Sequence, residues 1–445
     1  MLKRHRISML LVLAVAAAGA VAATAAAGNG NAKYVANPPA IKGPAVSSVT
    51  APQFPGFGNH CGPLFGVSYP LACYDPTQIR NAYDVPSSLD GSGQTIVIVD
   101  AYGDPTIQDD LAAFDNLFGV PAPPSFTIYH GSATQTAGTH DASGWALETA
   151  LDVEWAHAIA PKANIVLAEA PSSSGNAINS TEAHVVSRYP GSIVSQSFGI
   201  NENAINGNGD NIQWRQADQN YRAFAAAGDT VLASAGDYGA TTGTDSNTPS
   251  FPSSDPWVTS VGGTEGLPYP YGLCPSTSSD QCSYGGEQVW NEPDTFAVPL
   301  ATGGAPSQLF PAPGYQGSSV TGYDVRTTPD VSYNAAGNGG VLVAQGGSFW
   351  LVGGTSCGSP QWAGIFALVD QARAKAGLGP IGFANPALYA IYQSPRYGSD
   401  FHDITVGDNT LAGAPVAGYS AGPGYDLATG IGTPDAANLV SDLSK

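Results

Sequence analysis

Apolar runs with strand character alternate with longer amphipathic stretches through most of this 445-residue chain. Strands that are separated by helices cannot pair as hairpins, so this order favours a parallel sheet with helices on both faces. The predicted strands are 94–100, 163–170, 192–199, 229–237 and 256–264, and the predicted helices are 105–119, 144–165, 211–228 and 359–377. We therefore predict an α/β fold with a mainly parallel central sheet.

The first 27 residues have the composition of a secretory signal peptide. Basic residues precede an alanine-rich apolar run, and the small residues around Ala25 and Ala27 suit cleavage. A membrane anchor is the weaker alternative, because the run is diluted by alanine and no later stretch is long and apolar enough to span a bilayer. We expect a secreted, extracellular protein. Its mature form is expected to be a monomer that is not bound to a membrane.

The chain is strongly acidic, with 35 Asp and Glu against 15 Lys and Arg and a formal net charge of −20. A surface of this sign repels phosphates and anionic lipids, so nucleic acid and anionic membranes are excluded as expected partners. It suits a protein that works in acid, where many of the carboxylates are protonated and their mutual repulsion falls.

Two regions lack the alternating pattern. Residues 28–72 are rich in Pro, Gly, Ser and Asn and predict an extended N-terminal segment. Residues 265–325 carry Gly, Pro, Tyr and a cysteine pair and predict a long surface excursion. Residues 73–445 as a whole are predicted to be one domain.

The chain has five cysteines, which in an oxidising compartment suggest two disulfides and one free thiol. Pairing Cys61 with Cys73, and Cys274 with Cys282, closes two short loops. Cys357 is then left over, and we favour a small buried residue at this position over a catalytic thiol.

The run GSFWLVGGTS (347–356) predicts a strand that leads into a glycine turn. Ser356 follows this turn, in VGGTSCGSPQWAG, at the start of a predicted helix. Backbone N–H groups at a helix start can help to bind a developing oxyanion. Serine commonly caps helices, however, and as a nucleophile it needs a base to take its proton. The motif alone therefore favours a helix cap.

Histidine is the usual base for such a serine. A subtilisin-like order would be Asp100, His140 and Ser356, with His140 in AGTHDASG. Subtilisins carry their catalytic histidine just before the Gly-Thr-His of this motif, and Ala137 holds that place here. The histidine interpretation is therefore strained.

A pair of acids on the helix 144–165 offers an alternative base. Glu148 and Asp152 are four residues apart, which places both carboxylates on one face of the helix. Apolar neighbours leave little solvated surface on this helix, so we expect both acids to be at least partly buried. Buried paired carboxylates repel each other and are costly without a role, which favours function over a solvated acidic face.

Taken together, these motifs resemble the sedolisin family, the serine-carboxyl peptidases. The resemblance covers 73–445 in order, through YDPTQIRNAYDV, GQTIVIVDAYG, FPSSDPWVTSVGGT, TPDVSYNA, GGTSCGSPQWAG, FANPALY and GPGYDLATGIGTP. It implies a subtilisin-like fold in which a glutamate replaces histidine as the base.

The resemblance also implies a role for each residue of the site. Ser356 becomes the nucleophile, Glu148 its general base and acid, and Asp152 the residue that orients Glu148. Asp237, in ASAGDYGA, becomes the donor to the oxyanion, although an A-G-D sequence alone is more often a turn cap. Since a carboxylate repels an oxyanion, Asp237 must be protonated to act, so activity in acid is expected. Asp100 and Phe198 stand where some members of the family have a glutamate and a tryptophan.

A calcium ion is the one cofactor that the resemblance implies. It maps the ligands to the side chains of Asp403 and Asp426 and to the main-chain carbonyls of Ile404, Gly422 and Gly424. Hard oxygen donors of this kind suit Ca²⁺, whereas the residues alone equally suit turn-capping aspartates.

We therefore expect a calcium-stabilised, acid-acting serine-carboxyl endopeptidase that hydrolyses proteins or peptides. The alternatives are a subtilisin-like Ser/His/Asp hydrolase and a catalytically weak binding homologue. Sedolisins usually carry a large folded propeptide, and only about 45 residues separate the predicted signal peptide from the matching region, so how activity is restrained stays open. The sequence also leaves the substrate preference open.

Overall fold

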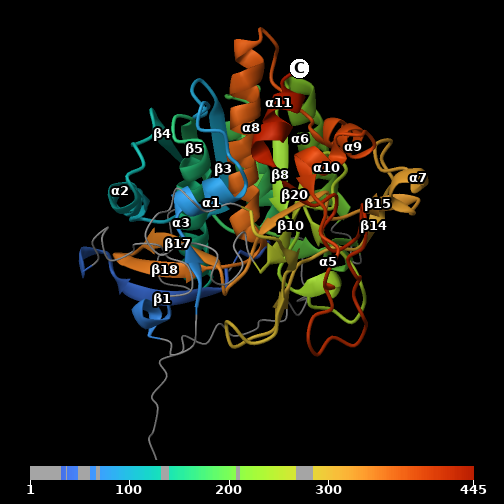
Figure 1. Ribbon diagram of the computed structural model, residues 1–445, viewed down its shortest axis with the longest axis horizontal. Coiled ribbons are helices and arrows are strands. Elements are labelled where there is room, and N and C mark those ends of the chain that lie inside the picture. The colour runs from blue at the N-terminus through green and yellow to red at the C-terminus, as the bar shows by residue number, and fades with distance from the viewer. Residues whose placement is uncertain are drawn as a thin grey trace, which may run out of the picture.

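The structure is a computed structural model that describes residues 32–36, 38–48, 61–66, 71–131, 140–206, 211–266 and 284–445. Its centre is an eight-stranded sheet of order β11-β10-β8-β6-β3-β5-β4, with β16 also paired to β10 (Figure 1). The strands are β3 (Thr95–Ala101), β4 (Phe126–His130), β5 (Asn164–Ala170), β6 (Ile193–Gln196), β8 (Thr230–Ser234), β10 (Thr259–Glu265), β11 (Gln288–Val289) and β16 (Val331–Asn334). Every pair is parallel except β10 with β11, so the predicted parallel sheet is confirmed.

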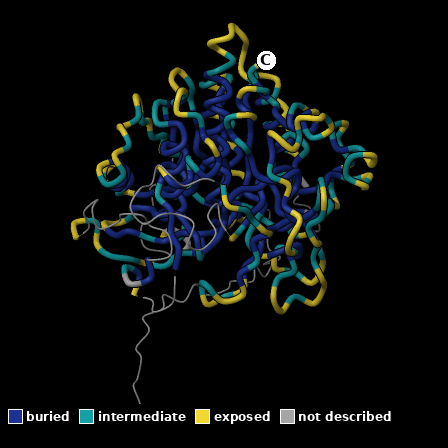
Figure 2. Tube along the Cα trace, in the orientation of Figure 1, coloured by how far each residue is buried: buried dark blue, intermediate teal, exposed yellow. Residues whose placement is uncertain are grey.

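Helices cover both faces of this sheet because its strands are apolar on both sides. In β3, Ile96 and Ile98 belong to one core, while Val97 and Val99 belong to the other. The first core contains α1 (Pro76–Ala82), α2 (Ile107–Phe118), α3 (His140–Ile159), α8 (Gly358–Lys375), α9 (Asn385–Tyr392) and α11 (Ala436–Leu443). The second contains α4 (Gly175–Val186) and α6 (Asn211–Ala227). Figure 2 shows both cores as the dark centre of the molecule.

Helices α3 and α8 pass very close to each other under the sheet. A Cβ atom on Gly364 of α8 would lie 2.5 Å from Cβ of Ile159 on α3, which is closer than Cβ atoms approach non-bonded neighbours. Glycine at this position therefore lets the two helices approach. The contact brings the helix that carries Glu148 beside the helix that follows Ser356.

A second, four-stranded sheet has the order β1-β18-β17-β2. Its strands are β1 (Ala40–Ala45), β2 (Cys73–Tyr74), β17 (Gly340–Gln345) and β18 (Ser348–Val352). The strand expected before Ser356 is thus present as β18, but it pairs antiparallel with β17 and β1 and lies outside the central sheet. Residues 40–45, from the N-terminal segment, supply an edge strand of this sheet.

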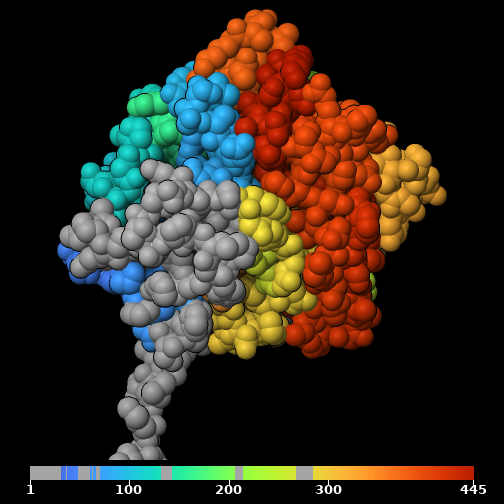
Figure 3. All heavy atoms as spheres, in the orientation of Figure 1, coloured from blue at the N-terminus to red at the C-terminus, as the bar shows by residue number. Residues whose placement is uncertain are grey.

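The remaining elements are short. Strand pairs form between β7 (Ile200–Asn201) and β9 (Ser250–Phe251), β12 (Asn291–Glu292) and β13 (Leu300–Ala301), β14 (Pro306–Pro311) and β15 (Val325–Thr327), and β19 (Phe401–His402) and β20 (Thr433–Pro434). The short helices are α5 (Glu202–Asn206), α7 (Ser318–Thr321) and α10 (Tyr397–Asp400). The C-terminal part of the chain covers one side of the molecule, with α7 at its edge (Figure 3).

The surface excursion predicted for 265–325 is wrong for its described part. Trp290, Leu300 and Ala301 are buried, and β11 joins the central sheet. The reason is that Trp290 and Leu300 form a small core of their own with Ala335.

The structure joins Cys61 to Cys73 by a disulfide and leaves Cys357 buried and free, as expected. Cys274 and Cys282, like the predicted signal peptide, lie outside the described residues. Within the described part of the chain, none of the helices combines the length and apolar character needed to cross a membrane.

Candidate active site

Helix α3 carries Glu148 and Asp152 into the interior. It is buried along most of its length, and the side chains of both acids are fully inaccessible to solvent. The expected burial of the pair is therefore confirmed. Neither oxygen of Glu148 makes a hydrogen bond of normal geometry with another described residue.

Ser356 lies between β18 and α8, in the single 3-10 turn Thr355–Cys357. Gly354, which precedes this turn, has a φ of 99°, a conformation that favours glycine over residues with a side chain. A Cβ atom at Gly354 would also lie 2.7 Å from Oδ2 of Asp237. The glycine thus allows the turn to place Ser356 beside this carboxyl group.

Asp237 follows β8, the neighbour of β6 in the central sheet, and its side chain is bound to the turn of Ser356. Thr355 donates to Oδ1 of Asp237 twice, from its backbone N at 2.8 Å and from Oγ1 at 2.7 Å. Burial raises the pKa of Asp237, and the two hydrogen bonds from Thr355 act against this shift. A carboxyl group at the rim of the site, half-buried in this way, holds its proton more tightly than an exposed one.

The pKa of Glu148 is raised well above its ordinary value. Burial is the main cause, followed by the charges of Asp152 and Asp100, while the nearby hydroxyl of Ser356 lowers it. Asp237 is close enough to raise it further. The structure therefore brings the four predicted residues, Glu148, Asp152, Asp237 and Ser356, into one site.

Asp152 is linked to a residue that the sequence did not reveal. The hydroxyl of Ser197, just after β6, donates to Oδ1 of Asp152 at 2.7 Å. Behind it lies Asp100, whose pKa burial raises to about 8. The negative charge of Asp100 also raises the pKa of Asp152. Glu148, Asp152 and Asp100 are thus three buried carboxyl groups, here called the buried carboxyl chain, in which Asp100 raises the pKa of Asp152 and both raise the pKa of Glu148.

Two aromatic residues lie behind the site. Phe198 is buried, and its ring centroid is 5.7 Å from that of Trp145. Trp145 precedes Glu148 by three residues on α3, so both face the same side of the helix. The sequence directed attention to Phe198 alone, since nothing in the local pattern showed that Trp145 packs against it.

The thiol of Cys357 is unsuited to nucleophilic attack. Burial raises its pKa well above the ordinary value, and the charges of Glu148, Asp237 and Asp152 raise it further. A thiolate is the reactive form, so this environment makes the residue inert.

The histidine side chains that the structure describes have partners elsewhere. His130 lies 2.5 Å from Glu169, and the buried His157 lies 3.2 Å from Asp115. The ring of His402 stacks on that of Tyr284, and the ring of His184 lies tilted against that of Tyr129. The side chain of His140, on which the subtilisin-like alternative depends, lies outside the described residues.

Four of the five predicted calcium ligands are in contact in two pairs near the C-terminus. Asp403 accepts a hydrogen bond from N of Gly424 at 2.9 Å, and Asp426 accepts one from N of Gly422 at 3.1 Å. Ile404, next to Asp403, is buried with its side chain in a small apolar cluster. The carboxylates of Asp403 and Asp426 are hard oxygen donors of the kind that suits Ca²⁺. Asp426 also accepts hydrogen bonds from N of Ala428 and N of Thr429, as a turn-capping aspartate does.

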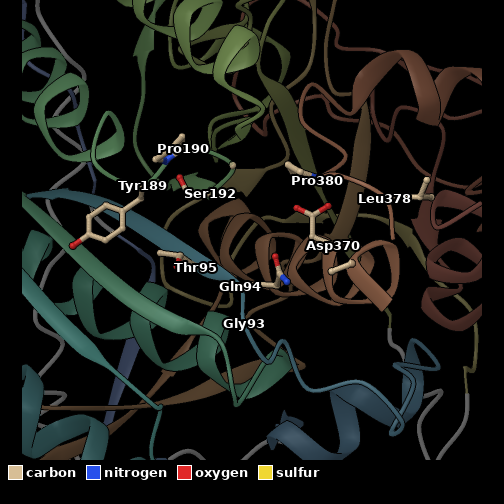
Figure 4. Close-up of a pocket in the computed structure, with 11 residues that line it drawn as sticks. Gly93, Gln94, Thr95, Tyr189, Pro190, Ser192, Asp370, Leu378 and Pro380 are labelled. Atoms are coloured by element: carbon tan, nitrogen blue, oxygen red, sulfur yellow. The ribbon is translucent and has the colours of Figure 1, made fainter. Parts of the chain in front are cut away.

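A separate hollow of about 270 Å³ lies at the opposite end of the central strands. Figure 4 shows its lining, with Thr95 at the start of β3, Ser192 just before β6, and Asp370 on α8. Reactive groups of α/β sheets gather at the carboxyl ends of the strands, and this hollow is at the amino ends. It is therefore distinct from the site around Ser356.

Comparison with known proteins links this site to peptidases. The subtilase family matches residues 105–382. Kumamolisin from Bacillus sp. (strain MN-32) is 34% identical over 387 residues, which cover 83% of this chain and 63% of kumamolisin. Sedolisin from Pseudomonas sp. (strain 101) is 29% identical over 378 residues, which cover 82% of this chain and 60% of sedolisin. The chain thus spans about three fifths of the length of these curated relatives.

A solved structure agrees with these relatives. Pseudomonas sedolisin, a serine-carboxyl proteinase complexed with two molecules of pseudo-iodotyrostatin, aligns with a TM-score of 0.71 and 26% identity. The alignment covers 83% of this chain and 98% of that one. The fold around the site is therefore that of the solved peptidase.

Proposed function

Since the chain belongs to the subtilase family, in its sedolisin branch, we propose that it is a secreted serine-carboxyl endopeptidase that acts in acid on protein or peptide substrates. The observation that carries the proposal is the arrangement around Ser356. Glu148 lies beside the nucleophile with Asp152 and Asp100 behind it, and Asp237 is bound to the turn that holds Ser356.

Glu148 acts as the general base in the first half of the reaction. Oγ of Ser356 forms a bond to the carbonyl carbon of the substrate, and its proton passes to Glu148. When the carbon–nitrogen bond breaks, Glu148 returns this proton to the leaving amine. Water then attacks the acyl-enzyme, with Glu148 again taking the proton and Ser356 receiving it.

Asp237 stabilises the oxyanion that forms at each step. Its Oδ1 already accepts two hydrogen bonds from Thr355, so Oδ2 is the atom that carries the proton and donates it as a hydrogen bond. Only the protonated form can do so, and burial favours that form. Activity therefore falls when Asp237 ionises.

The acidic limb of the pH profile, where activity falls at low pH, is set by the buried carboxyl chain. Burial and mutual repulsion make Glu148 and Asp152 hold protons tightly, and a base must first lose its proton. Because these groups titrate together, the limb reflects the loss of one proton from the whole chain. The two limbs together give a bell-shaped profile.

Calcium is proposed as a stabiliser rather than as a participant in catalysis. Asp403, Asp426 and the carbonyls of Ile404, Gly422 and Gly424 would hold it, some distance along the chain from Ser356. When bound, the ion would supply positive charge that neutralises the two carboxylates and fixes the loop. No step of hydrolysis passes through it.

The proposal is tested by digestion of a denatured protein between pH 2 and pH 8. Hydrolysis should be strong in acid, weak near neutrality and absent from Ser356→Ala. A maximum above pH 7, or full activity in Ser356→Ala, would remove the serine-carboxyl mechanism.

A further inference from the structure

Strand β17 has one edge that is covered by a helix over most of its length. The strand pairs with β18 on one side, but on the other side it pairs with β2 only at its first two residues. Two side chains of α3 bind the main chain beyond that point. Nε1 of Trp155 donates to O of Leu342 at 3.0 Å, and N of Ala344 donates to Oε2 of Glu154 at 3.0 Å. Helix α3 thus supplies the partners that a further strand would supply.

The hairpin of β17 and β18 leads directly to the nucleophile, because Ser356 comes four residues after Val352, the end of β18. On α3, Glu154 follows Asp152 by two residues, and residues two apart on a helix point to different sides. One side of α3 therefore carries Asp152 and Glu148, and another side binds the hairpin that continues to Ser356. The hydrogen bond between Glu154 and the hairpin thus helps to fix the nucleophile relative to its base.

The turn of the same hairpin is bound by acids that come from outside α3. N of Gly346 donates to Oδ2 of Asp110, on α2, at 3.0 Å. Oγ1 of Thr106 donates to the same oxygen at 2.6 Å and to Oδ1 of Asp104 at 2.9 Å. Both aspartates are buried. The hairpin therefore lies over a group of buried carboxyl groups.

Glu154 is the most enclosed member of this group. It is fully buried, and its Oε1 has no hydrogen-bond partner among the described residues. Burial raises the pKa of Glu154 well above its ordinary value, the hydrogen bond from Ala344 lowers it, and the charges of Asp110, Asp115 and Asp104 raise it further. A protonated carboxyl group can still accept the hydrogen bond from Ala344, so the contact with β17 does not require the charge.

The basic groups on the neighbouring elements bind other atoms. His157, three residues further along α3, lies 3.2 Å from Asp115. Arg80 of α1 donates to main-chain carbonyls at the end of α3. Residues 340–352 contain no acidic or basic side chain, and Lys42 of β1 lies over a tryptophan ring of β18. Ionised Glu154 would therefore add a negative charge to a group of acids without a cation bound to it.

We propose that Glu154 is a positioning residue for the nucleophile, which in its protonated form holds the hairpin of β17 and β18 against α3 and on losing its proton lets the hairpin detach. The inference rests on the proposed peptidase function, because the attached hairpin aligns Ser356 with Glu148. Detachment exposes Glu154 to water, where a glutamate titrates near pH ~4.3. Between this pH and the higher pKa of the buried group, detachment releases a proton to solvent. Each pH unit therefore increases the detached fraction by up to about tenfold.

The first test measures hydrogen exchange of the amides of residues 342–347 in Ser356→Ala protein, from pH 4 to pH 7, with correction for the intrinsic exchange rate. Protection should fall with rising pH, by up to about tenfold per unit. In Glu154→Gln, the amide oxygen still accepts from Ala344 but the group cannot ionise, so most of this slope should disappear. An equal slope in the two proteins, or no slope in the parent, would overturn the proposal.

Amides of β3 report global unfolding in the same experiment and should stay more protected than those of the hairpin at every pH. If β3 and the hairpin exchange equally fast, the hairpin does not detach on its own and the proposal is wrong.

Glu182→Gln is the matched control. Glu182, on α4, is also fully buried, and neither of its oxygens has a hydrogen-bond partner among the described residues. This variant should keep the slope of the parent protein at the hairpin. Trp155→Phe removes the other bond to β17 without changing an ionisable group, so protection should fall by the same factor at every pH. A flattened slope in Glu182→Gln would assign the pH dependence to general stability and contradict the role of Glu154.

The second test measures kcat and KM at the acid optimum in protein with Ser356 intact. Glu154→Leu leaves N of Ala344 buried without an acceptor, so the hairpin should shift and kcat should fall by about tenfold or more. Alignment of the nucleophile acts on the chemical step, so KM should stay within about twofold. Glu154→Gln should restore kcat to within about threefold of the parent. A raised KM with unchanged kcat, or a glutamine variant as slow as the leucine variant, would contradict the positioning role.

The exchange measurement does not depend on hydrolysis, so the two proposals fail separately. A protein that digests denatured substrates but shows no pH-dependent exchange of the hairpin keeps the peptidase function and loses the role of Glu154. A protein with the expected exchange that digests nothing keeps the pH-dependent attachment and loses the peptidase function. If Glu154→Leu does not fold, which circular dichroism would show, the exchange slopes of Glu154→Gln and Glu182→Gln decide.

Discussion

Thr355 donates two hydrogen bonds to a single oxygen of Asp237, from its backbone N at 2.8 Å and from its Oγ1 at 2.7 Å. Oγ1 of Thr355 also accepts a hydrogen bond from N of Gly236, at 3.0 Å. The residue that precedes the nucleophile thus orients the carboxyl group that is proposed to stabilise the oxyanion. One oxygen of Asp237 is used for this attachment, and the other is left for the substrate.

Asp237→Asn tests the role of the proton on this carboxyl. The amide oxygen can accept both hydrogen bonds from Thr355, which directs the amide NH₂ to the position of Oδ2 as a permanent donor. We expect lower activity at the acid optimum, because geometry and acidity differ, but a flatter alkaline limb than in the wild type. The measurement is kcat/KM across pH on one peptide. An unchanged alkaline limb would place the limiting proton elsewhere.

Thr355→Val tests the same carboxyl without changing it. The variant keeps the shape of the side chain but removes the Oγ1 donor, which lowers the pKa of Asp237 in the wild type. The pKa of Asp237 should therefore rise, its protonated form should persist to higher pH, and the alkaline limb of kcat/KM should move upward. Movement of this limb to lower pH would contradict the assignment.

Glu148→Gln tests the general base. Glutamine keeps the shape of the side chain but cannot accept the proton of Ser356, so kcat should fall by roughly 10²–10⁴, the usual contribution of general-base catalysis. His140→Ala is the control for the histidine alternative and should keep most of the activity. The opposite ranking of the two variants would favour the subtilisin-like mechanism.

Local patterns predicted the elements that position the site. The spacing of Glu148 and Asp152 places both acids on one helix face wherever that helix lies, and apolar strand runs such as 94–100 predicted the parallel sheet. The sequence did not predict the roles of Ser197 and Trp145, because these roles depend on contacts between segments far apart in sequence. No local pattern shows that a serine after one strand will donate to Asp152.

The same dependence on contacts between distant segments explains where the observed fold differs from the predicted one. The run before Ser356 predicted a strand correctly, but a single strand does not specify its partners, and β18 pairs with β17 and β1 rather than with the central sheet. Residues 32–48 lack periodicity because their order comes from pairing with other backbones. Backbone hydrogen bonds do not depend on side-chain identity, so composition cannot reveal them.

Removal of calcium should lower the melting temperature. A ligand that binds only the folded state at about 100 times its Kd stabilises it by about 2.7 kcal/mol. The measurement is thermal unfolding at pH 7 with excess Ca²⁺ and with excess chelator, on Ser356→Ala protein to prevent self-digestion. Asp426→Asn should abolish the difference between the two conditions. If the protein with Asp426 intact melts at the same temperature with excess Ca²⁺ and with excess chelator, the ion is removed from the proposal.

Asp100 should make the folded state less stable as pH rises from acid to neutral. Burial raises the pKa of Asp100 to about 8, whereas an aspartate in the unfolded chain titrates near pH ~4. Between these values the unfolded chain has released the proton and the folded chain still holds it, so the free energy of unfolding falls with increasing pH. One such group contributes at most about 1.4 kcal/mol per pH unit.

Asp100→Asn cannot ionise in either state, so it should remove this contribution and flatten the decline. The measurement is urea unfolding of Ser356→Ala protein at pH 4, 5.5 and 7, with and without Asp100→Asn. Asp109→Asn, which changes a solvent-exposed acid on α2, is the matched control and should leave the slope unchanged. Because Asp100 also raises the pKa of Asp152 and Glu148, the variant should in addition shift the acidic limb of kcat/KM to lower pH when Ser356 is intact. A decline that is equally steep with and without Asp100→Asn would mean that Asp100 is ionised in the folded protein, and the buried carboxyl chain behind Glu148 would then end at Asp152.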